Sequence, residues 1–446
     1  MAHPLESVLE TAIRYGNMGQ EKKESARITE AAERLYDATR TVRILSSLAW
    51  PQSHREHFLK KDRYVLPDIE YPEFDPAETL ERLDHARKKI RDDSDIDSWL
   101  GRIARRIESS ARLLASCGTP AFLEHSQALY GVPTDPLRDE QTTSLDLATR
   151  VNDMFDSLAN LDLGAPDASC YLADYVAERM QEAVTRMFGD EAPEVMVVDE
   201  LSANALAGPK RIRIRRGASF TDKDVSQLIH HEAFIHVATS MNGLAQDRLR
   251  ILGASHPGST RTQEGLAVFA EFITASMDVD RFRRLADRIV ATQMAIDGAD
   301  FTEVFRYFLE RVESAEQAFE NARRVFRGGV VTGGVPFTKD IVYLDGLLRV
   351  HNFLRVIVNA GRTDCLLLLF CGKLDVEHIP VLCQLADLGL VREPRFLPPW
   401  AADRRFLIAY LAYSSFLNRV DLGKVREHYV SMLENSPVVA FATARE

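Results

Sequence analysis

Residues 230–236, near the middle of the chain, constrain the fold more than any other stretch. They read HHEAFIH, in which His231 and His236 stand five positions apart. On an α-helix each residue advances by about 100°, so side chains five apart diverge by about 140°. A π-bulge widens the turn and returns such a pair to one face, and π-bulges occur preferentially at functional sites. The spacing therefore predicts a π-turn between Glu232 and His236; a helix that ends near His236 is the alternative.

The residue types in this stretch are those of a zinc peptidase centre. The imidazoles of His231 and His236 are suited to bind the metal, and the neighbouring Glu232 is suited to activate water. The common peptidase motif, H-E-x-x-H, places its histidines four apart. Because ordinary histidines on a half-buried helix would give the same string, the motif alone leaves both interpretations open.

A glutamate in the next predicted helix completes a possible set of metal ligands. Residues 263–277 read QEGLAVFAEFITASM, in which Glu264 is followed by apolar residues and by Glu271 at helical spacing. A glutamate one helix beyond the histidine pair is the usual third ligand in one class of zinc peptidases, whose fourth position stays open to water. Taken alone, Glu264 fits a solvated helix residue better, but together with the two histidines it is predicted as the third ligand.

The chain resembles the family of proteins named for the QEGLA motif, to which the microtubule-associated tyrosine carboxypeptidases are similar. Besides HExxxH and QEGLA, the resemblance rests on three blocks: LYGVPTDP (129–136), GGVPFTKDIVYLDG (333–346) and GLVREPRFLPPW (389–400). It extends from about residue 30 to the end of the sequence. It implies a zinc carboxypeptidase-like hydrolase, with His231, His236 and Glu264 as ligands of one Zn²⁺ ion and Glu232 as general base. It does not imply the substrate.

The block that begins at Gly333 is the second place where we expect chemistry. Attack of water on a peptide carbonyl develops an oxyanion, to which the phenol of Tyr343 can donate a hydrogen bond. A carboxypeptidase also needs a cation for the terminal carboxylate, and the candidates, in falling order, are Arg327, Lys339 and Arg213. Alternatively, Lys339 caps the next helix and Tyr343 packs in the core. The resemblance, and not the spacing, places this segment near the metal.

A change of period marks two predicted strands. Residues 195–198 read VMVV, and residues 211–215 read RIRIR, with alternating isoleucines and arginines typical of a strand with one buried and one wet face. A sheet edge beside a metal centre can hold an extended peptide by strand addition, so residues 211–215 are predicted as the substrate edge. A nucleic-acid patch is the alternative for this arginine row, and the net charge of −11 disfavours it. Thr221 is predicted to cap the helix that follows.

The rest of the chain has mostly helical periodicity, and its 446 residues exceed what a single core usually holds. The predicted fold class is α+β, mainly helical, with a zincin-like metallopeptidase core and a small sheet beside the active-site helix. We expect an N-terminal helical region (1–120), a catalytic core (121–346) and a C-terminal helical region packed on that core (347–446).

The composition also restricts the compartment and the partners. Five scattered cysteines, an odd number, are typical of reduced thiols. Residues 1–19 carry Glu6, Glu10 and Arg14 where a signal peptide needs an apolar stretch, and the longest apolar run is too short to span a bilayer. We therefore expect a cytoplasmic protein that binds neither nucleic acid nor membrane, and its oligomeric state stays open. His256 is followed by Pro257, Gly258 and Ser259, which favour a turn, and it is expected at the surface rather than at the metal.

Together these patterns predict a zinc-dependent hydrolase that removes a C-terminal residue from a peptide or protein. Two alternatives stay open: a zinc amidase or deacylase that acts on a small metabolite, and a non-catalytic regulatory protein with a vestigial site. The complete set of two histidines and two glutamates argues against the vestigial site. The metal is also open to revision, because a set of two histidines and one glutamate can hold other divalent ions.

Overall fold

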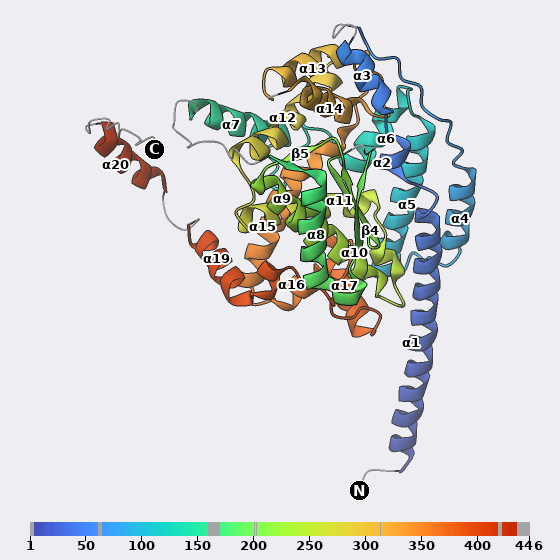
Figure 1. Cartoon of the computed structure of the whole chain (residues 1–446). Helices are drawn as coiled ribbons and strands as arrows, with labels where there is room; N and C mark the ends of the chain where they lie inside the picture. Colours follow the sequence, from blue (N-terminus) through green and yellow to red (C-terminus); the bar gives the residue numbers. More distant parts are fainter. Residues whose placement is uncertain are drawn as a thin grey trace.

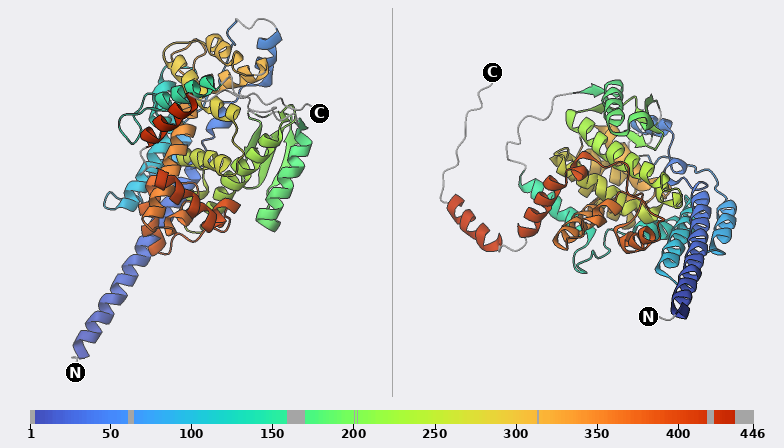
Figure 2. Two further views of the ribbon diagram at one scale, coloured as in Figure 1. Left: turned by 90° about the vertical axis from the view of Figure 1, so that its left-hand side faces the viewer. Right: turned by 90° about the horizontal axis from the view of Figure 1, so that it is seen from below.

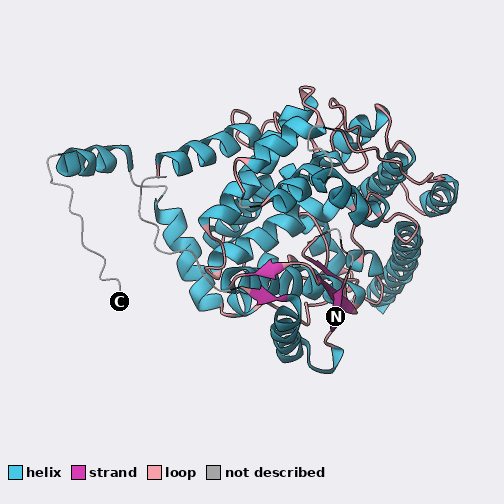
Figure 3. Ribbon diagram, turned by 45° about the horizontal axis from the view of Figure 1, so that its top comes forward, coloured by secondary structure: helices cyan, strands magenta, loops and turns pink. Residues whose placement is uncertain are grey.

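The computed structural model describes residues 4–60, 65–158, 170–199, 201, 203–312, 314–417 and 422–434. These residues form a mainly helical protein with two small sheets, whose strands gather on one side of the molecule (Figure 3). The predicted α+β, mainly helical fold class is confirmed. In the described part of the chain, no helix combines the length and the apolar character needed to cross a membrane.

The N-terminal part consists of helices that pack along one flank. Helix α1 (Pro4–Thr39) projects from the body of the molecule (Figures 1 and 2), and the part nearest its C-terminal end packs against α4 (Ala77–Arg87) and α5 (Asp95–Ala115). Ile28, Ala31 and Leu35 recur at helical spacing on α1 and are buried there. The other helices of this part are α2 (Ile44–Ser47), α3 (Gln52–Lys60), α6 (Ala121–Tyr130) and α7 (Ser144–Ser157).

The larger sheet has three strands in the order β2-β4-β3. Strand β4 (Arg211–Arg215) pairs with β2 (Glu194–Val198) in parallel and with β3 (Ala205–Ala207) in antiparallel register. The prediction that residues 211–215 form a substrate edge is therefore wrong, because both sides of β4 are already paired. Alternating isoleucines and arginines determine which face of a strand is buried, but they carry no information about which strands lie at the edges.

The segment that carries the histidines is one continuous helix with a widened middle. It begins as α9 (Asp222–Leu228), continues as the π-helix η2 (Ile229–Val237) and ends as α10 (Ala238–Leu244). The predicted cap is confirmed, since the Thr221 hydroxyl accepts from the Asp224 backbone N–H and the Asp224 carboxylate accepts from that of Thr221. Strand β3 contacts η2, so the small sheet lies beside this helix.

Two glycines bring together the central helices α11 (Pro257–Ile273) and α15 (Val342–Asn359). A Cβ atom on Gly265 would lie 2.1 Å from the carbonyl carbon of Gly346, and one on Gly346 would lie 2.2 Å from the carbonyl oxygen of Arg261. Only hydrogen fits at both positions, so the two backbones touch. This contact sets Glu264, on α11, close to the residues at the start of α15.

The remaining helices, apart from the last one, surround this centre (Figure 1). The largest hydrophobic core combines Leu35 of α1, Phe269 of α11 and Leu382 of α17, and so draws on all three predicted regions. The elements not yet named are β1 (Tyr171–Leu172), paired with β5 (Ser219–Phe220), and α8 (Ala173–Phe188), η1 (Gly189–Glu191), η3 (Arg250–Gly253), α12 (Val279–Ile296), α13 (Phe301–Leu309), α14 (Ala315–Phe326), η4 (Thr338–Ile341), α16 (Asp364–Leu368), η5 (Val376–His378), α17 (Ile379–Asp387), α18 (Pro399–Ala402), α19 (Arg404–Leu417) and α20 (Leu422–Glu434).

Candidate metal centre

The widened turn predicted from the histidine spacing is present. Residues Ile229–Val237 form a π-helix, and α10 continues it without a break. The prediction of a π-turn is confirmed, and the alternative of a helix that ends near His236 is wrong. The wider turn brings the two imidazoles to one side, with their ring centroids 4.9 Å apart.

Glu264 on α11 completes a compact group of three possible ligands. Its Oε2 lies 3.6 Å from Nε2 of His231 and 3.6 Å from Nε2 of His236. One ligand atom from each of the three side chains lies within 4.8 Å of the others. A tetrahedral zinc ion holds its ligands at about 2.1 Å, which places them about 3.4 Å from one another. The donor types and their spacing therefore fit a zinc ion.

The electrostatics of this group favour a positive charge between the side chains. Burial alone would raise the pKa of Glu264, but Lys339 and the two histidines hold it well below its usual range. Burial alone would lower the pKa of His231, yet hydrogen bonds to Glu264 and Glu271 raise it to about 10. Carboxylates that stabilise an imidazolium so strongly also provide a favourable place for a metal cation.

Glu232 directly follows His231 on η2 and is half-buried. Within the described part of the chain its carboxylate has no hydrogen bond or ion pair, whereas the other two acidic residues of the site, Glu264 and Glu271, have several. A carboxylate without such contacts can accept a proton from a water molecule near the histidines.

A second buried carboxylate, which our sequence reasoning did not assign, supports His231 from behind. Oε1 of Glu271 lies 2.6 Å from Nδ1 of His231, on the opposite side of the ring from Glu264. Glu271 also accepts hydrogen bonds from Arg281 and from Gln227. A signal for Glu271 was present in the sequence, because it follows Glu264 by seven residues, close to two full helical turns.

Lys339, the second of the three candidates for the substrate carboxylate, contacts the candidate metal ligand Glu264. Its Nζ donates to Oε1 of Glu264 at 2.8 Å and to the hydroxyl of Tyr343 at 3.3 Å. Arg324, which is paired with Asp340, donates to the same hydroxyl at 3.4 Å. Lys339 thus links Tyr343 to the candidate metal ligand Glu264. The Tyr343 hydroxyl oxygen already accepts hydrogen bonds from two cations, Lys339 and Arg324. Its own hydrogen is left to point toward a third group.

Arg327, the first candidate for the substrate carboxylate, is buried close to the same residues. Its guanidinium lies 5.3 Å from the centre of the Phe337 ring, and its Nε has no hydrogen-bond partner among the residues that the structure describes. Burial, together with the positive charge of Arg324, lowers the pKa of Arg327 to about 10. The charges of Arg327, Lys339 and Glu264 all act on the hydroxyl of buried Tyr130, which places the arginine near the cluster.

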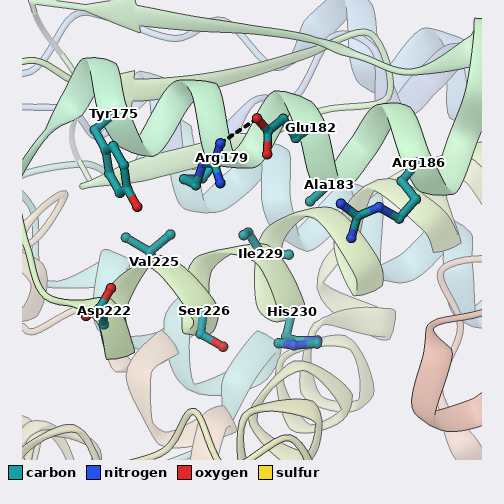
Figure 4. Close-up of a pocket in the computed structure, with 10 residues that line it drawn as sticks. All are labelled: Tyr175, Arg179, Glu182, Ala183, Arg186, Asp222, Val225, Ser226, Ile229 and His230. Carbon is teal, nitrogen blue, oxygen red and sulfur yellow. Dashed lines mark hydrogen bonds and ion pairs between the residues drawn. The ribbon is translucent and has the colours of Figure 1, made fainter.

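The structure does not bring Arg213 to this cluster. On β4 the isoleucines face the core that contains Ala233 and Phe234 of η2, while Arg213 is exposed on the opposite face. His230 also points away from the cluster. It lines a pocket between α8 and the helix that carries the histidines, at the opposite end of this pocket from Tyr175 (Figure 4).

The expectation of a surface position for His256 is wrong. His256 is buried as the residue that precedes Pro257 at the start of α11, and burial lowers its pKa to about 3. The Pro-Gly-Ser sequence that suggested a turn at the surface instead forms the first turn of this helix. Proline is common at that position because its missing N–H has no partner there.

These features define a mainly helical protein with a candidate metal centre built from a π-helix and its neighbouring helix. The model of the family described as microtubule-associated tyrosine carboxypeptidase matches residues 56–419, and the chain belongs to that family. The resemblance stated from the motifs is therefore confirmed over most of the chain. Membership indicates a carboxypeptidase-like activity on proteins. A search of curated proteins finds no match.

Proposed function

We propose that the protein is a hydrolase with one zinc ion that removes the C-terminal residue from a peptide or protein. The observation that supports this most is the convergence of His231, His236 and Glu264 from two helices, with Glu232 beside them. The sheet next to the π-helix is consistent with a zincin-like core. We assign His231, His236 and Glu264 as zinc ligands because their atoms have the spacing that tetrahedral coordination needs.

The reaction would divide between the metal and the acid–base residue. When bound, zinc supplies Lewis-acid chemistry, which lowers the pKa of water and polarises the peptide carbonyl. Glu232 takes a proton from the attacking water and passes it to the nitrogen of the departing residue. Its freedom from other partners suits this role, because a carboxylate held by an arginine would be a weaker base.

Tyr343 is the proposed donor to the oxyanion that forms as water attacks. Its hydroxyl oxygen accepts from Lys339 and Arg324, so its hydrogen is available to a substrate oxygen. Lys339 has the role of orienting both Tyr343 and Glu264, in place of the carboxylate-binding role predicted from the sequence. A donor fixed in advance in a buried site stabilises developing charge without rearrangement.

Arg327 is the proposed partner of the substrate's terminal carboxylate. It is buried, and its Nε has no partner in the described part of the chain, so an incoming carboxylate would relieve the cost of that burial. The forked guanidinium matches the two oxygens of a carboxylate. The extended chain of the substrate would then run beside β3, since β3 is an edge strand of the described sheet and contacts the π-helix.

The test is to incubate the zinc-loaded protein with peptides that vary at the C-terminus and to follow the loss of single residues by mass spectrometry. Peptides that end in tyrosine come first, because the family description names that residue. Glu232→Gln should retain zinc and lose at least about 100-fold in rate. The proposal fails if the wild type binds zinc and leaves every peptide intact, and the role of Glu232 fails if Glu232→Gln retains its turnover.

A further inference from the structure

We propose that Glu271 is a positioning residue that fixes His231 as a metal ligand, and that Arg281 and Gln227 hold Glu271 for this purpose. This inference rests on the proposed zinc site. It assigns to three residues outside the ligand set the task of setting the orientation and the proton position of one ligand. None of the three touches the cation position itself.

The contact between Glu271 and His231 determines which ring nitrogen faces the ligand group. An ionised carboxylate can only accept, so Nδ1 of His231 must carry the hydrogen in their 2.6 Å contact. The neutral ring then has its lone pair on Nε2, which is the nitrogen that faces Glu264 at 3.6 Å. Metal-bound histidines characteristically donate their second N–H in this way, which fixes the ring and increases its basicity.

The carboxylate of Glu271 is itself held from several sides. Its side chain is 0% exposed. Arg281 donates through Nε to Oε2 and through its terminal nitrogen to Oε1, both at 3.0 Å, and the Gln227 amide donates to Oε1 at 3.0 Å. Two of these donors lie on different helices, α9 and α12, so the position of the carboxylate is set by the tertiary packing. Its orientation toward His231 is therefore rigid.

The arrangement acts on one histidine and not on the other. In the described part of the chain, the side chain of His236 contacts Glu264 and the His231 ring but has no carboxylate on its second nitrogen. If Glu271 served only to balance the charge of Arg281, its shortest contact would be expected with Arg281 and not with the ring of His231. The asymmetry points to a specific role in holding His231.

The experiment compares Glu271→Gln with a matched control, Asp97→Asn. Asp97 is also 0% exposed and is held by Arg27 through two hydrogen bonds, but it contacts no ligand residue. Zinc affinity is measured on each full-length protein by competition with a chromophoric chelator, and the absorption spectrum is recorded after substitution with Co²⁺. Removal of an outer partner of a metal ligand typically weakens metal binding by about 10- to 100-fold.

We expect Glu271→Gln to lose zinc affinity in that range and to shift the cobalt spectrum, while Asp97→Asn stays within about twofold of wild type. Wild-type affinity and an unchanged spectrum in a folded Glu271→Gln protein would overturn the inference. If that variant does not fold, Gln227→Met removes one donor and leaves the His231 contact in place; an unchanged cobalt spectrum in Gln227→Met then counts against the inference. A wild-type protein that binds no zinc would instead overturn the proposed function.

Discussion

Two buried carboxylates, Asp97 in the N-terminal helices and Glu271 at the candidate metal centre, are built alike, but only Glu271 contacts a proposed metal ligand. Each is fully covered, and each accepts two hydrogen bonds from one arginine, Arg27 or Arg281. The remaining hydrogen bonds to the Asp97 carboxylate come from the Ser94 hydroxyl and from the backbone N–H of Arg91, both just before α5. The shortest contact of Glu271 goes to the ring of a proposed metal ligand, His231.

The comparison shows that burial and ion pairing alone do not identify a functional residue. In both places the protein recovers the cost of burying a charge with an arginine and further donors. The pKa of both carboxyl groups is lowered to about 2, although burial alone would raise it. Glu271 differs from Asp97 because it also contacts His231, a proposed metal ligand. Experiments on metal binding therefore distinguish the two carboxylates better than experiments on charge or exposure.

The largest effect on folding is expected from Asp97→Asn. The variant should lose about 2 kcal/mol of unfolding free energy, because Arg27 loses one of its two charged partners and keeps only Glu24. Since the pKa of Asp97 is depressed in the folded protein, this contribution is present above about pH 4 and is lost as the pH falls toward 2. Urea unfolding at pH 7 and at pH 3 measures it. A change in zinc affinity of this variant would remove the contrast with Glu271.

A smaller effect, on rate rather than on affinity, is expected from Lys339→Met. Two influences on zinc oppose each other: Glu264 loses a donor that orients it, and a nearby positive charge that repels the metal disappears. The net change in zinc affinity should stay within about threefold, whereas peptide hydrolysis should fall about tenfold as Tyr343 loses one of its two fixed donors. Chelator competition and steady-state rates on the same preparation test this. Hydrolysis at the wild-type rate would show that Lys339 is not needed to orient Tyr343 and Glu264.

The smallest effect is expected from Arg213→Ala. The side chain lies on the exposed face of a fully paired strand, opposite the core that contains η2. Unfolding free energy should change by less than about 0.5 kcal/mol, as is usual for exposed positions, and the KM for peptides should stay within about twofold. Thermal unfolding and peptide kinetics check both. A large rise in KM would show that substrate crosses this face after all and would restore the carboxylate-binding role predicted from the sequence.

The parts of the site that lie close together in the sequence could be predicted well. The five-residue spacing of His231 and His236 predicted the π-turn, with a helix that ends near His236 as the alternative, because a widened helix places both imidazoles on one side. The strand period of residues 211–215 and the cap at Thr221 were predictable for the same reason, since each depends on neighbours a few residues away.

The parts that depend on distant segments could not be derived from spacing. Lys339 was predicted as a substrate contact because nothing local shows that its amine reaches Glu264, on another helix. Residues 211–215 were predicted as an edge strand, but they form the central strand of the sheet. The period of a strand shows which face is buried and does not show which strands lie beside it. His256 was expected at the surface because its sequence context resembles a turn, whereas packing buries it.

By itself, the sequence determined the widened helix and the set of side chains able to hold a cation, because these follow from the local geometry of one helix and from side-chain chemistry. Only the tertiary structure decided what surrounds them. The contact of Gly265 with Gly346 brings α11 against α15 and so sets Lys339 and Tyr343 beside Glu264. Gln227 on α9 and Arg281 on α12 orient Glu271, the partner of His231. The orientation of a buried carboxylate depends on the hydrogen-bond donors that tertiary packing places around it.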